Sequence, residues 1–597
     1  MPSATSPAQT SGPWPLSFEP GQTVAQAVYL SGLVEPPSLC SGLGQCGKCR
    51  MRLYHSEEPQ MLATEAVAEG SFPVTCLRFA TILPEDRALL SEADLTAGYR
   101  LACHHRAEKG LVAILPPGSC SLTGLPAPVL PPSGVSPSEN AALAEPFIRE
   151  GVLAVDLGTT SVQWVLLAHQ ATTGGAEQVD AGSLVNPQAG AGSDVVSRLA
   201  FAAKPQGART LTRLTRAMLA RLVEKARQCG VRVRAIVLAA NPAMTALTLG
   251  LDTRSLGVAP YSLPFAGGMK TEIDTLPPIL LPAPVSPFVG GDISAGYAAI
   301  LADCRAPFPF LLADLGTNGE FVLAVNAHEA YAASVALGPA LEGIGLTFGT
   351  GAAEGAITGY ALAPHGLAPQ WFSSPKLVQE DIASKGATGM SGTGYLSLLG
   401  ILRKTGIMQA DGQLARGPHM LAKAQERYLG ELTNTISGAG GATLAGKMLR
   451  PLPLPSTPFF ALPHGMYLSA RDVEELLKVK AAFSMGLECL LERAGLAWAD
   501  LNTVCLAGAM GTHVDMQALC TLGFLPDDLT TASKVKAVGN TALKGAMLLA
   551  EEVLSQGTGR LEAMLANWAV TVKSVNLAED AAFQTGFIRH MVFGTPK

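Results

Sequence analysis

The stretches LAVDLGTTS at residues 153–161 and LADLGTNG at residues 312–319 decide the fold of this 597-residue chain. In both, Asp-Leu-Gly-Thr follows one apolar strand and precedes another, and the two copies are offset by 158 residues. From residue 151 onward, apolar strands alternate with helical stretches, a pattern typical of an α/β fold. The repeat therefore predicts two similar lobes, related by a pseudo-twofold axis, with a cleft between them.

The two turns have the chemistry of a nucleotide site. A Gly-Thr turn exposes backbone N–H groups that can cradle phosphate oxygens. The carboxylates of Asp156 and Asp314 can hold Mg²⁺ directly or through water, because Mg²⁺ prefers oxygen ligands and keeps several waters. A single copy is equally typical of ordinary turn chemistry, but two copies in matching strand contexts favour phosphate binding.

Two further glycine-rich turns extend this prediction. FVGGD at residues 288–292 precedes a helix over residues 293–302, which Asp292 could cap. LAGAMGTH at residues 506–513 follows a strand over residues 503–506 and could bring adenosine against the backbone. The expected nucleotide contacts in the four turns are Gly158, Thr159, Thr160, Gly290, Gly291, Gly316, Thr317, Asn318, Gly508 and Gly511.

A cysteine-rich loop, CSGLGQCGKC at residues 40–49, is the sharpest local signal. Its glycines let the backbone wrap tightly around Cys40, Cys46 and Cys49. Iron–sulfur clusters usually take four cysteines, and this C-x5-C-x2-C run is one residue longer than the plant-type spacing. Cys103 is the best candidate for the fourth ligand, and Cys76 competes with it. Zinc ribbons usually show two CxxC pairs where this segment has one, so a [2Fe–2S] cluster is favoured over structural zinc or free thiols.

The residues around this loop predict a small domain of their own. A short helix over residues 23–31 precedes the loop and a strand over residues 50–54 follows it, an order that resembles a β-grasp ferredoxin. Because four cysteines are already available, His104 and His105 are expected to lie at the surface. Prolines crowd the next segment, residues 106–149, which reads as a semi-rigid tether.

Composition narrows the class of protein. Hydrophobic residues make up 48% of the chain and charged residues 15%, and the formal net charge is −6, which argues against nucleic acid or an anionic membrane as the main partner. No stretch is apolar and long enough to predict a membrane span. Residues 1–18 contain no Lys or Arg and no apolar core, and the 11 cysteines do not pair evenly. These features predict a cytoplasmic protein with a metal or cluster site.

Taken together, these motifs resemble a known family. The Asp-Leu-Gly-Thr turns and residues 506–511 resemble the phosphate and adenosine motifs of the acetate and sugar kinase, heat-shock chaperone and actin superfamily. Residues 186–188 (NPQ), 192–198 (GSDVVSR), 241–242 (NP), 337–343 (LGPALEG) and 539–540 (GN) resemble one branch of it. That branch carries an N-terminal [2Fe–2S] domain and contains the reductive activators of corrinoid-dependent methyltransferases. The resemblance covers about residues 15–590, although residues 240–243 (ANPA) depart from the usual Gly-Asn-Thr.

The resemblance implies an α/β multidomain architecture. A β-grasp [2Fe–2S] ferredoxin-like domain would span residues 14–105 and a Pro-rich linker residues 106–149. A two-lobed RNase H-like ATPase would follow, with lobe I over residues 150–305 and lobe II, including the adenosine-binding region, over residues 306–597. The middle region that such activators can carry is expected to be reduced to the tether.

The resemblance also implies an activity. An ATP-dependent iron–sulfur reductase with ATPase activity would pass one electron from its [2Fe–2S] cluster to Co(II) of a corrinoid protein, which regenerates Co(I) for methyl transfer. ATP and Mg²⁺ would be cofactors, with Asp156, Asp314 and Glu320 as catalytic candidates and Thr347 as a residue facing the corrinoid. Its partners would be the corrinoid protein and an upstream low-potential electron donor, and a homodimer is compatible with this scheme.

Three other functions fit parts of the pattern. The chain could be a small-molecule kinase with a regulatory cluster, another kind of ATP-driven electron donor, or a binding protein that senses redox state or nucleotide. A kinase needs a catalytic base near the transferred phosphate, and no residue pair in the sequence identifies one.

Overall fold

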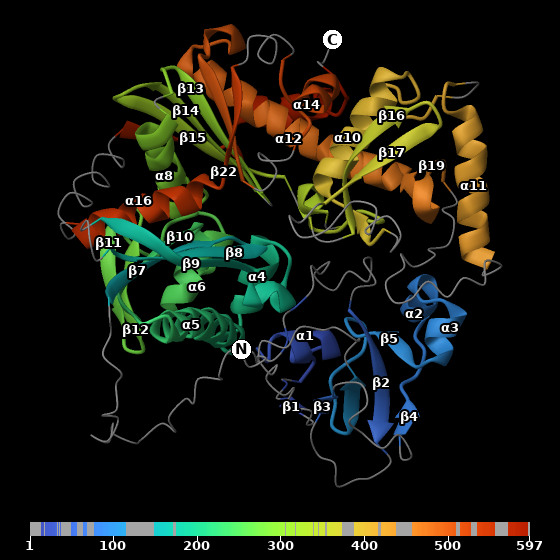
Figure 1. Ribbon diagram of the computed structural model, residues 1–597, viewed down its shortest axis with the longest axis horizontal. Coiled ribbons are helices and arrows are strands. Elements are labelled where there is room, and N and C mark those ends of the chain that lie inside the picture. The colour runs from blue at the N-terminus through green and yellow to red at the C-terminus, as the bar shows by residue number, and fades with distance from the viewer. Residues whose placement is uncertain are drawn as a thin grey trace, which may run out of the picture. The chain divides into compact units, whose positions relative to one another are not determined.

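The computed structural model describes two compact units, drawn in Figure 1. One contains the described residues up to Ile114 and the segment Pro187–Gly192, which includes the short 3-10 helix η3 (Pro187–Ala191), and the other contains the rest. The described residues are 14–16, 18, 20–32, 34, 36, 49–56, 64–67, 77–114, 149–170, 175–304, 306–316, 318–337, 339–343, 345–352, 355–372, 387–415, 419–437, 457–508, 514–526, 534–555 and 571–594.

The N-terminal unit is built on one mixed sheet with strand order β1-β3-β6-β2-β4 and with β5 paired to β2. Its strands are β1 (Trp14–Leu16), β2 (Arg50–Ser56), β3 (Thr64–Val67), β4 (Leu77–Phe79), β5 (Tyr99–Leu101) and β6 (Leu111–Ile114). Its helices are α1 (Val24–Tyr29), α2 (Pro84–Leu89) and α3 (Glu92–Thr96). The expected helix near residues 23–31 and strand near residues 50–54 are therefore both present. Thr23 begins α1 because its hydroxyl accepts a hydrogen bond from the Gln26 backbone N–H, in a capping box.

The first lobe of the second unit has a six-stranded sheet with order β11-β12-β10-β7-β8-β9. Three antiparallel strands come first, and β10 and β12 then add in parallel on the other side of β7. The strands are β7 (Arg149–Leu157), β8 (Ser161–His169), β9 (Ala176–Val185), β10 (Val231–Ala240), β11 (Met269–Ile273) and β12 (Leu276–Leu281). The helices are α4 (Val195–Ala202), α5 (Pro205–Gln228), α6 (Pro242–Leu249), α7 (Arg254–Gly257) and α8 (Gly291–Ala299), and the π-helical turn η4 (Ile300–Cys304) follows α8.

The second lobe repeats this topology, with strand order β22-β21-β13-β14-β15-β23. Strands β13 to β15 are antiparallel, and β21 and β22 add in parallel beside β13. The strands are β13 (Phe310–Leu315), β14 (Asn318–Asn326), β15 (Glu329–Ala336), β21 (Thr503–Ala507), β22 (Val535–Gly539) and β23 (Val572–Ser574). The shared strand order confirms the two similar lobes predicted from the repeated sequence.

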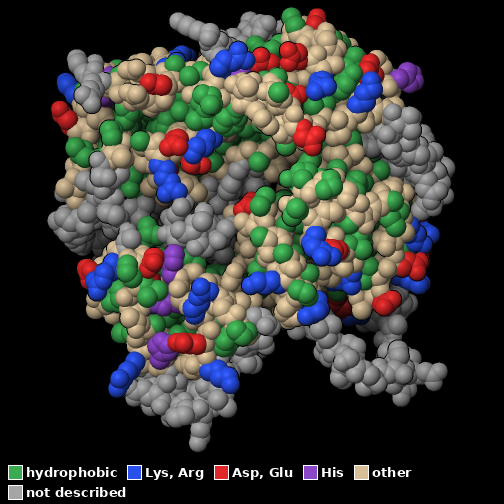
Figure 2. Space-filling model, turned by 180° about the vertical axis from the view of Figure 1, so that it is seen from behind, with side chains coloured by type: hydrophobic (Ala, Val, Ile, Leu, Met, Phe, Trp, Pro, Cys, Tyr) green, Lys and Arg blue, Asp and Glu red, His purple; other side chains and the backbone are tan. Residues whose placement is uncertain are grey.

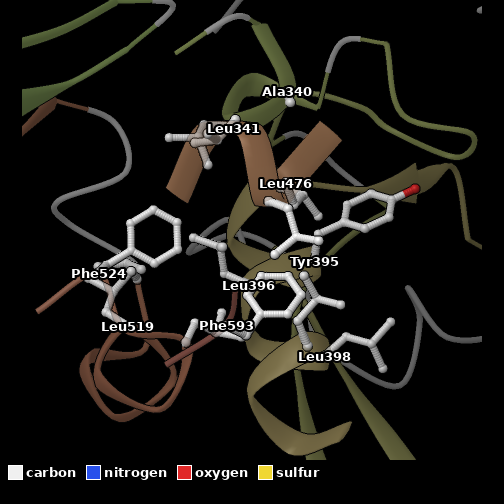
Figure 3. Packing of buried hydrophobic residues seen from close by; sticks show 14 of the residues in the cluster. Ala340, Leu341, Tyr395, Leu396, Leu398, Leu476, Leu519, Phe524 and Phe593 are labelled. Carbon is white, nitrogen blue, oxygen red and sulfur yellow. The ribbon is translucent and has the colours of Figure 1, made fainter. Parts of the chain in front are cut away.

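A subdomain is inserted between β15 and β21 of the second lobe. Its strands are β16 (Ala356–Ala363), β17 (Gly366–Trp371), β18 (Gly389–Met390), β19 (Phe459–Leu462) and β20 (Met466–Ser469). Its helical elements are η5 (Pro339–Glu342), α10 (Gly392–Lys404), α11 (Ala422–Ser437), η6 (Pro463–Gly465), α12 (Ala470–Ala494) and η7 (Trp498–Asp500). Helices α14 (Met516–Leu522) and α18 (Ala581–Arg589) complete the largest apolar core, where Leu396, Leu476, Leu519 and Phe593 converge from separate elements (Figure 3).

Two helices lie between the two sheets of the second unit (Figure 1). Helix α16 (Thr541–Ser555) packs its apolar face, with Ala546 and Leu549, on the sheet of the first lobe. Helix α8 packs Ile293 and Tyr297 in the core of the second lobe and contacts α16. Helix α16 thus joins the first lobe although it belongs to the last tenth of the sequence.

The surface charges and the hydropathy of the helices can be described for part of the chain. Over the face seen in Figure 2, the described acidic and basic side chains are interspersed. No described helix combines the length and the apolar character needed to cross a bilayer.

Candidate functional site

Asp156 and Asp314 occupy equivalent positions in the two lobes. Each follows a run of fully buried apolar residues near the end of a central strand, β7 or β13. Asp156 lies opposite Gln163 on the neighbouring strand, and Asp314 lies opposite Glu320 in the same way. The repeated sequence thus places one carboxylate at the same point of each sheet, and the second lobe adds another carboxylate beside it.

Four acidic side chains form a carboxylate cluster: Asp156, Asp292, Asp314 and Glu320. Burial raises the pKa of Asp156 to about 7; the Asn540 hydrogen bond lowers it and the Asp292 charge raises it further. Burial, and then the charges of Asp156 and Asp292, raise the pKa of Asp314 to about 7. Like charges held close in a low-dielectric site disfavour ionisation of all of them. The cluster is therefore suited to a cation that would relieve the repulsion.

The two other members differ in exposure. Asp292 remains partly exposed, and burial raises its pKa to about 6. Glu320 is only 7% exposed, and its pKa is raised well above the usual value, first by burial and then by the charges of Asp292 and Asp314. Because Glu320 is the most deeply buried, we expect it to be the member that most readily carries a proton.

Asn540, late in the sequence of the second unit, is hydrogen-bonded to Asp156, which comes early in that unit. Its Nδ2 donates a hydrogen bond of 2.7 Å to Asp156 Oδ2, and its Oδ1 accepts one of 2.8 Å from the Leu543 backbone N–H at the start of α16. Sequence analysis gave Gly539-Asn540 only as one of the segments that resemble the family and assigned it no role in the site.

Glycines let two backbone turns approach the cluster closely. Gly508 has φ +81°, and a Cβ added there would lie 2.7 Å from Asp314 Oδ1. A Cβ at Gly290 would lie 2.5 Å from Asp292 Oδ1. Gly290 is itself the N-cap of α8 and Asp292 lies in its first turn, so the expectation that Asp292 caps this helix is wrong. Gly291 packs against the backbone of Pro282 instead, 2.7 Å from a built Cβ to its carbonyl oxygen.

The first Gly-Thr turn is held by three side chains. Asn186 Nδ2 donates to the Gly158 carbonyl at 2.7 Å, and Arg198, which is fully buried, donates from Nη2 to the Thr159 carbonyl at 2.5 Å. Asn241 Nδ2 donates to Thr159 Oγ1 at 3.2 Å. This support fixes the turn while Thr160 stays partly exposed.

The second turn is shaped by its own backbone. The Gly316 N–H donates to the Asn318 carbonyl at 3.0 Å, and Asn318 Nδ2 donates to Glu320 Oε1 at 3.4 Å. Asn318 therefore connects the turn to the carboxylate cluster. Thr317 and Gly511 lie outside the described residues.

The donor set fits Mg²⁺ in one particular way. Carboxylate oxygens are the ligands that this hard cation prefers. Among the described residues, however, no three or more His, Cys, Asp or Glu side chains are arranged to hold a metal ion. Carboxylates can also bind Mg²⁺ through the waters that it keeps, and this is the mode that the oxygen donors of the cluster fit.

Of the five N-terminal cysteines, Cys49 and Cys103 are described, and Cys40, Cys46 and Cys76 lie outside the described residues. Arg50 pairs with Leu101 across β2 and β5, and the Ala102 N–H donates to the Cys49 carbonyl at 3.2 Å. Cys49 comes just before β2 and Cys103 just after β5, so both lie at the same end of this strand pair. This position suits two ligands of one iron–sulfur cluster. The adjacent His104 has a buried Nε2 without a hydrogen-bond partner among the described residues.

His105 corrects the prediction that both histidines lie at the surface. Its ring is buried, and its Nε2 lies 2.9 Å from Oδ2 of the fully buried Asp86. Burial raises the pKa of Asp86, but hydrogen bonds from His105 and from two backbone N–H groups hold it below the usual value. Sequence reasoning missed this pair because no spacing signal connects residues 86 and 105.

Thr347 lies at the start of α12. Its Oγ1 donates to Asp472 Oδ1 at 2.9 Å and lies 3.2 Å from Ser469 Oγ, and its backbone N–H also donates to Asp472 Oδ1. Ser469 and Asp472 form the capping box of this helix. The Thr347 hydroxyl is therefore engaged with the helix end.

Two family models match consecutive parts of the second unit. Residues 151–303 match the RACo middle region, and residues 309–435 and 461–597 match the C-terminal ASKHA domain of RACo. The expectation that a middle region is reduced to a tether is wrong, since residues 151–303 match the model of that region.

Similar proteins were found by sequence and by structure. A corrinoid activation enzyme, RamQ, of Eubacterium limosum is 28% identical over 74% of this chain and 70% of its own length. A [Co(II) methylated amine-specific corrinoid protein] reductase of Methanosarcina barkeri is 25% identical over 43% of this chain and 42% of its own length. A solved reductive activator for a corrinoid, iron–sulfur protein has a TM-score of 0.58 at 20% identity, and the match covers 98% of this chain and 97% of that one. This likeness and the match to the ASKHA domain model together confirm the predicted α/β multidomain fold with an actin and sugar kinase type domain.

Proposed function

This chain belongs to the family of reductive activators of corrinoid proteins, and we propose that it uses ATP to drive one electron from an N-terminal [2Fe–2S] cluster onto Co(II) of a corrinoid protein. The observation that carries the ATP-dependent part is the carboxylate cluster, which joins the repeated Asp-Leu-Gly turns of both lobes at one point. The relatives named above act on corrinoid proteins, and this supports the proposed acceptor.

The proposed reaction is a one-electron transfer. The reduced cluster would lose one electron and Co(II) would gain it to become Co(I), so no bond to the protein forms or breaks. Plant-type clusters have potentials near about −400 mV, and each 59 mV of uphill one-electron transfer costs about 1.4 kcal/mol. The part of ATP is to favour the conformation in which this transfer is possible.

The residues at the carboxylate cluster have distinct proposed roles. Asp156 and Asp314 would hold the waters of Mg²⁺, and Glu320 would position the water that attacks the terminal phosphate. Gly508 and Gly290 let the backbone lie close to Asp314 and Asp292, because a side chain at either position would collide with these carboxylates. Asn540 would couple nucleotide binding to the position of α16, because it bonds Asp156 and caps that helix.

The cluster would be held by Cys40, Cys46, Cys49 and Cys103, and an upstream low-potential electron donor would reduce it. Three of these residues come from one loop and Cys103 from the end of β5. The position of Cys49 beside the segment that leads to Cys103 supports this set over one that uses Cys76.

The test follows the visible spectrum of cobalt. Anaerobic, reduced protein is mixed with a Co(II) corrinoid protein, with and without Mg-ATP. We expect Co(I) to form quickly only with Mg-ATP. Replacement of Cys46 by Ala should abolish the iron–sulfur absorbance and cobalt reduction together. Asp314→Asn should keep the absorbance, but Mg-ATP should no longer accelerate its cobalt reduction. ATP turnover coupled to a small alcohol or acid, with no cobalt reduction, would contradict the proposal and favour a kinase.

A further inference from the structure

Asp86 in α2 is a carboxylate with no exposed surface. Its Oδ1 accepts a hydrogen bond of 2.7 Å from the Leu101 N–H. Its Oδ2 accepts one of 2.9 Å from the Leu83 N–H and lies 2.9 Å from His105 Nε2. Leu101 and His105 stand two positions before and two positions after Cys103. One buried side chain therefore holds both ends of the turn that carries this cysteine.

Helix capping accounts for only part of this arrangement. Asp86 is the third residue of α2, and its bond to the Leu83 N–H is half of a capping box. Asp94 forms the equivalent capping box of α3, where it accepts hydrogen bonds from the Ser91 N–H and hydroxyl. Asp94, however, is partly exposed, and another of its partners is the Arg50 guanidinium, 3.7 Å away. Among the described residues, Asp94 makes no bond to the Cys103 turn.

A buried carboxylate is expensive unless its oxygens are hydrogen-bonded. Two of the three hydrogen-bond partners of Asp86, Leu101 and His105, belong to the Cys103 turn, and the third is the Leu83 N–H. An amide at this position could not replace it, since its NH₂ group would face a donor N–H on one side or the other. The arrangement therefore depends on a carboxylate.

We propose that Asp86 is a positioning residue for the iron–sulfur cluster, which fixes the Leu101–His105 turn so that the Cys103 thiolate stays at its ligand position. Cys103 comes from a segment separate from the cysteine loop, so its contribution to a shared site depends on how rigidly its own turn is held. The inference rests on the proposed function only in that Cys103 binds the cluster. It does not require ATP or cobalt.

The test compares Asp86→Asn with the matched variant Asp94→Asn in the full-length, anaerobically reconstituted protein. The readouts are the loss of cluster absorbance under an iron chelator, the EPR line shape of the reduced cluster and its midpoint potential. We expect the cluster of D86N to be lost at least about tenfold faster than in the wild type, with a broadened EPR signal. D94N should stay within about twofold of the wild type, because it loses a cap but no bond to the Cys103 turn.

A second variant covers the case in which D86N takes up no iron. His105→Ala leaves the bonds from Asp86 to Leu83 and Leu101 in place and removes only the support behind Cys103, so we expect its cluster to be lost a few times faster than in the wild type. D86N and H105A clusters that match the wild type in lability, line shape and potential would overturn the inference.

None of these readouts involves cobalt. Intact clusters without cobalt reduction would count against the proposed function alone. A wild-type protein that binds no iron would overturn both.

Discussion

Asp156, Asp292 and Asp314 hold a proton more readily in the folded protein than in the unfolded chain, because burial raises their pKa from 3.8 to between about 6 and about 7. The stability that they contribute is therefore fully present below about pH 4 and is lost as the pH rises through about 6 to 7. Without a ligand, the carboxylate cluster therefore lowers the stability of the folded protein most at neutral pH and above. A bound divalent cation would reverse this by favouring the ionised forms.

This gives a prediction for Asp314→Asn. The variant carries no charge at this position, so we expect the Tm of the ligand-free protein to fall less between pH 5.5 and pH 7.5 than in the wild type, by about 2 °C or more. Thermal unfolding at the two pH values measures it, with Asp252→Asn as the control at an exposed carboxylate. Equal pH dependence of D314N and the wild type would contradict the raised pKa.

A second prediction concerns the bond between Asn540 and Asp156. A hydrogen bond to a charged group contributes about 1.5–3 kcal/mol. We therefore expect Asn540→Ala to weaken Mg-ATP binding about tenfold to a hundredfold, measured by calorimetry. Asn502→Ala is the matched control, because that amide donates to the Phe308 carbonyl and lies away from the cluster. Equal losses in both variants would show that the effect is general.

Single residues also show how far the sequence alone could lead. Asp156 and Asp314 were predicted because a repeated Asp-Leu-Gly-Thr after an apolar strand has a local reason to bind phosphate. Asn540 lies 384 residues from Asp156, and no local pattern relates the two. The pair of Asp86 and His105 was not predicted, and His105 was wrongly expected at the surface, because burial of a polar pair depends on tertiary packing.

At the scale of elements, α8 and α16 pack against each other, and residues at the starts of both helices contribute to the carboxylate cluster or bond to it. A Cβ at Gly545 of α16 would lie 1.9 Å from the Ala295 carbonyl oxygen of α8. Asp292 and Asn540 stand at the starts of these two helices. A change in helix spacing should therefore reach the nucleotide site.

We expect Gly545→Ala to lower stability by about 1–3 kcal/mol, because the backbone of α8 must shift, and to weaken Mg-ATP binding as well. Gly430→Ala in α11 is the control. A Cβ there has no neighbour within 4 Å, so this variant should be neutral or up to about 1 kcal/mol more stable. Chemical unfolding and ATP titration test both. A neutral G545A would mean that the helices separate easily.

The Thr347 loop has a separate prediction. Loss of the hydroxyl bonds to Asp472 and Ser469 should cost about 1–2 kcal/mol in Thr347→Ala, whereas Thr347→Ser keeps them and should stay near the wild-type Tm. Cobalt reduction is then measured well below the Tm. An unchanged rate in T347A, with normal ATP turnover, would remove the proposed corrinoid-facing role and leave a structural one.

Individual strands and helices were easier to predict from the sequence than the elements that they pack against. The strands on either side of each Asp-Leu-Gly turn follow from apolar runs, and both appear where they were expected. The position of α16 did not follow, because a division of the chain near residue 305 depends on sequence texture, whereas the apolar face of α16 is buried on the sheet of the first lobe.

For the whole molecule, the two compact units and the Pro-rich segment between them set the remaining prediction. The linker predicted over residues 106–149 begins too early, because β6 (Leu111–Ile114) belongs to the N-terminal sheet. Residues 115–148 lie outside the described residues, and we propose that they act as a tether. A tether that can span two sites makes their encounter intramolecular and so raises its effective concentration. A protease site inserted at residues 126–132 and cleaved after purification should therefore slow cobalt reduction at micromolar protein, and excess N-terminal unit should restore it. An unchanged rate after complete cleavage would show that the tether is dispensable.

The place of α16 has a consequence for biosynthesis. The first-lobe strands have all left the ribosome once residue 281 has emerged, but the helix that covers one side of them ends at Ser555. At about 5–20 residues per second, the nascent chain spends roughly 15–55 s with that apolar side uncovered. Production of this protein should therefore depend on chaperones that shield growing polypeptides, and a stalled or truncated message should yield aggregates.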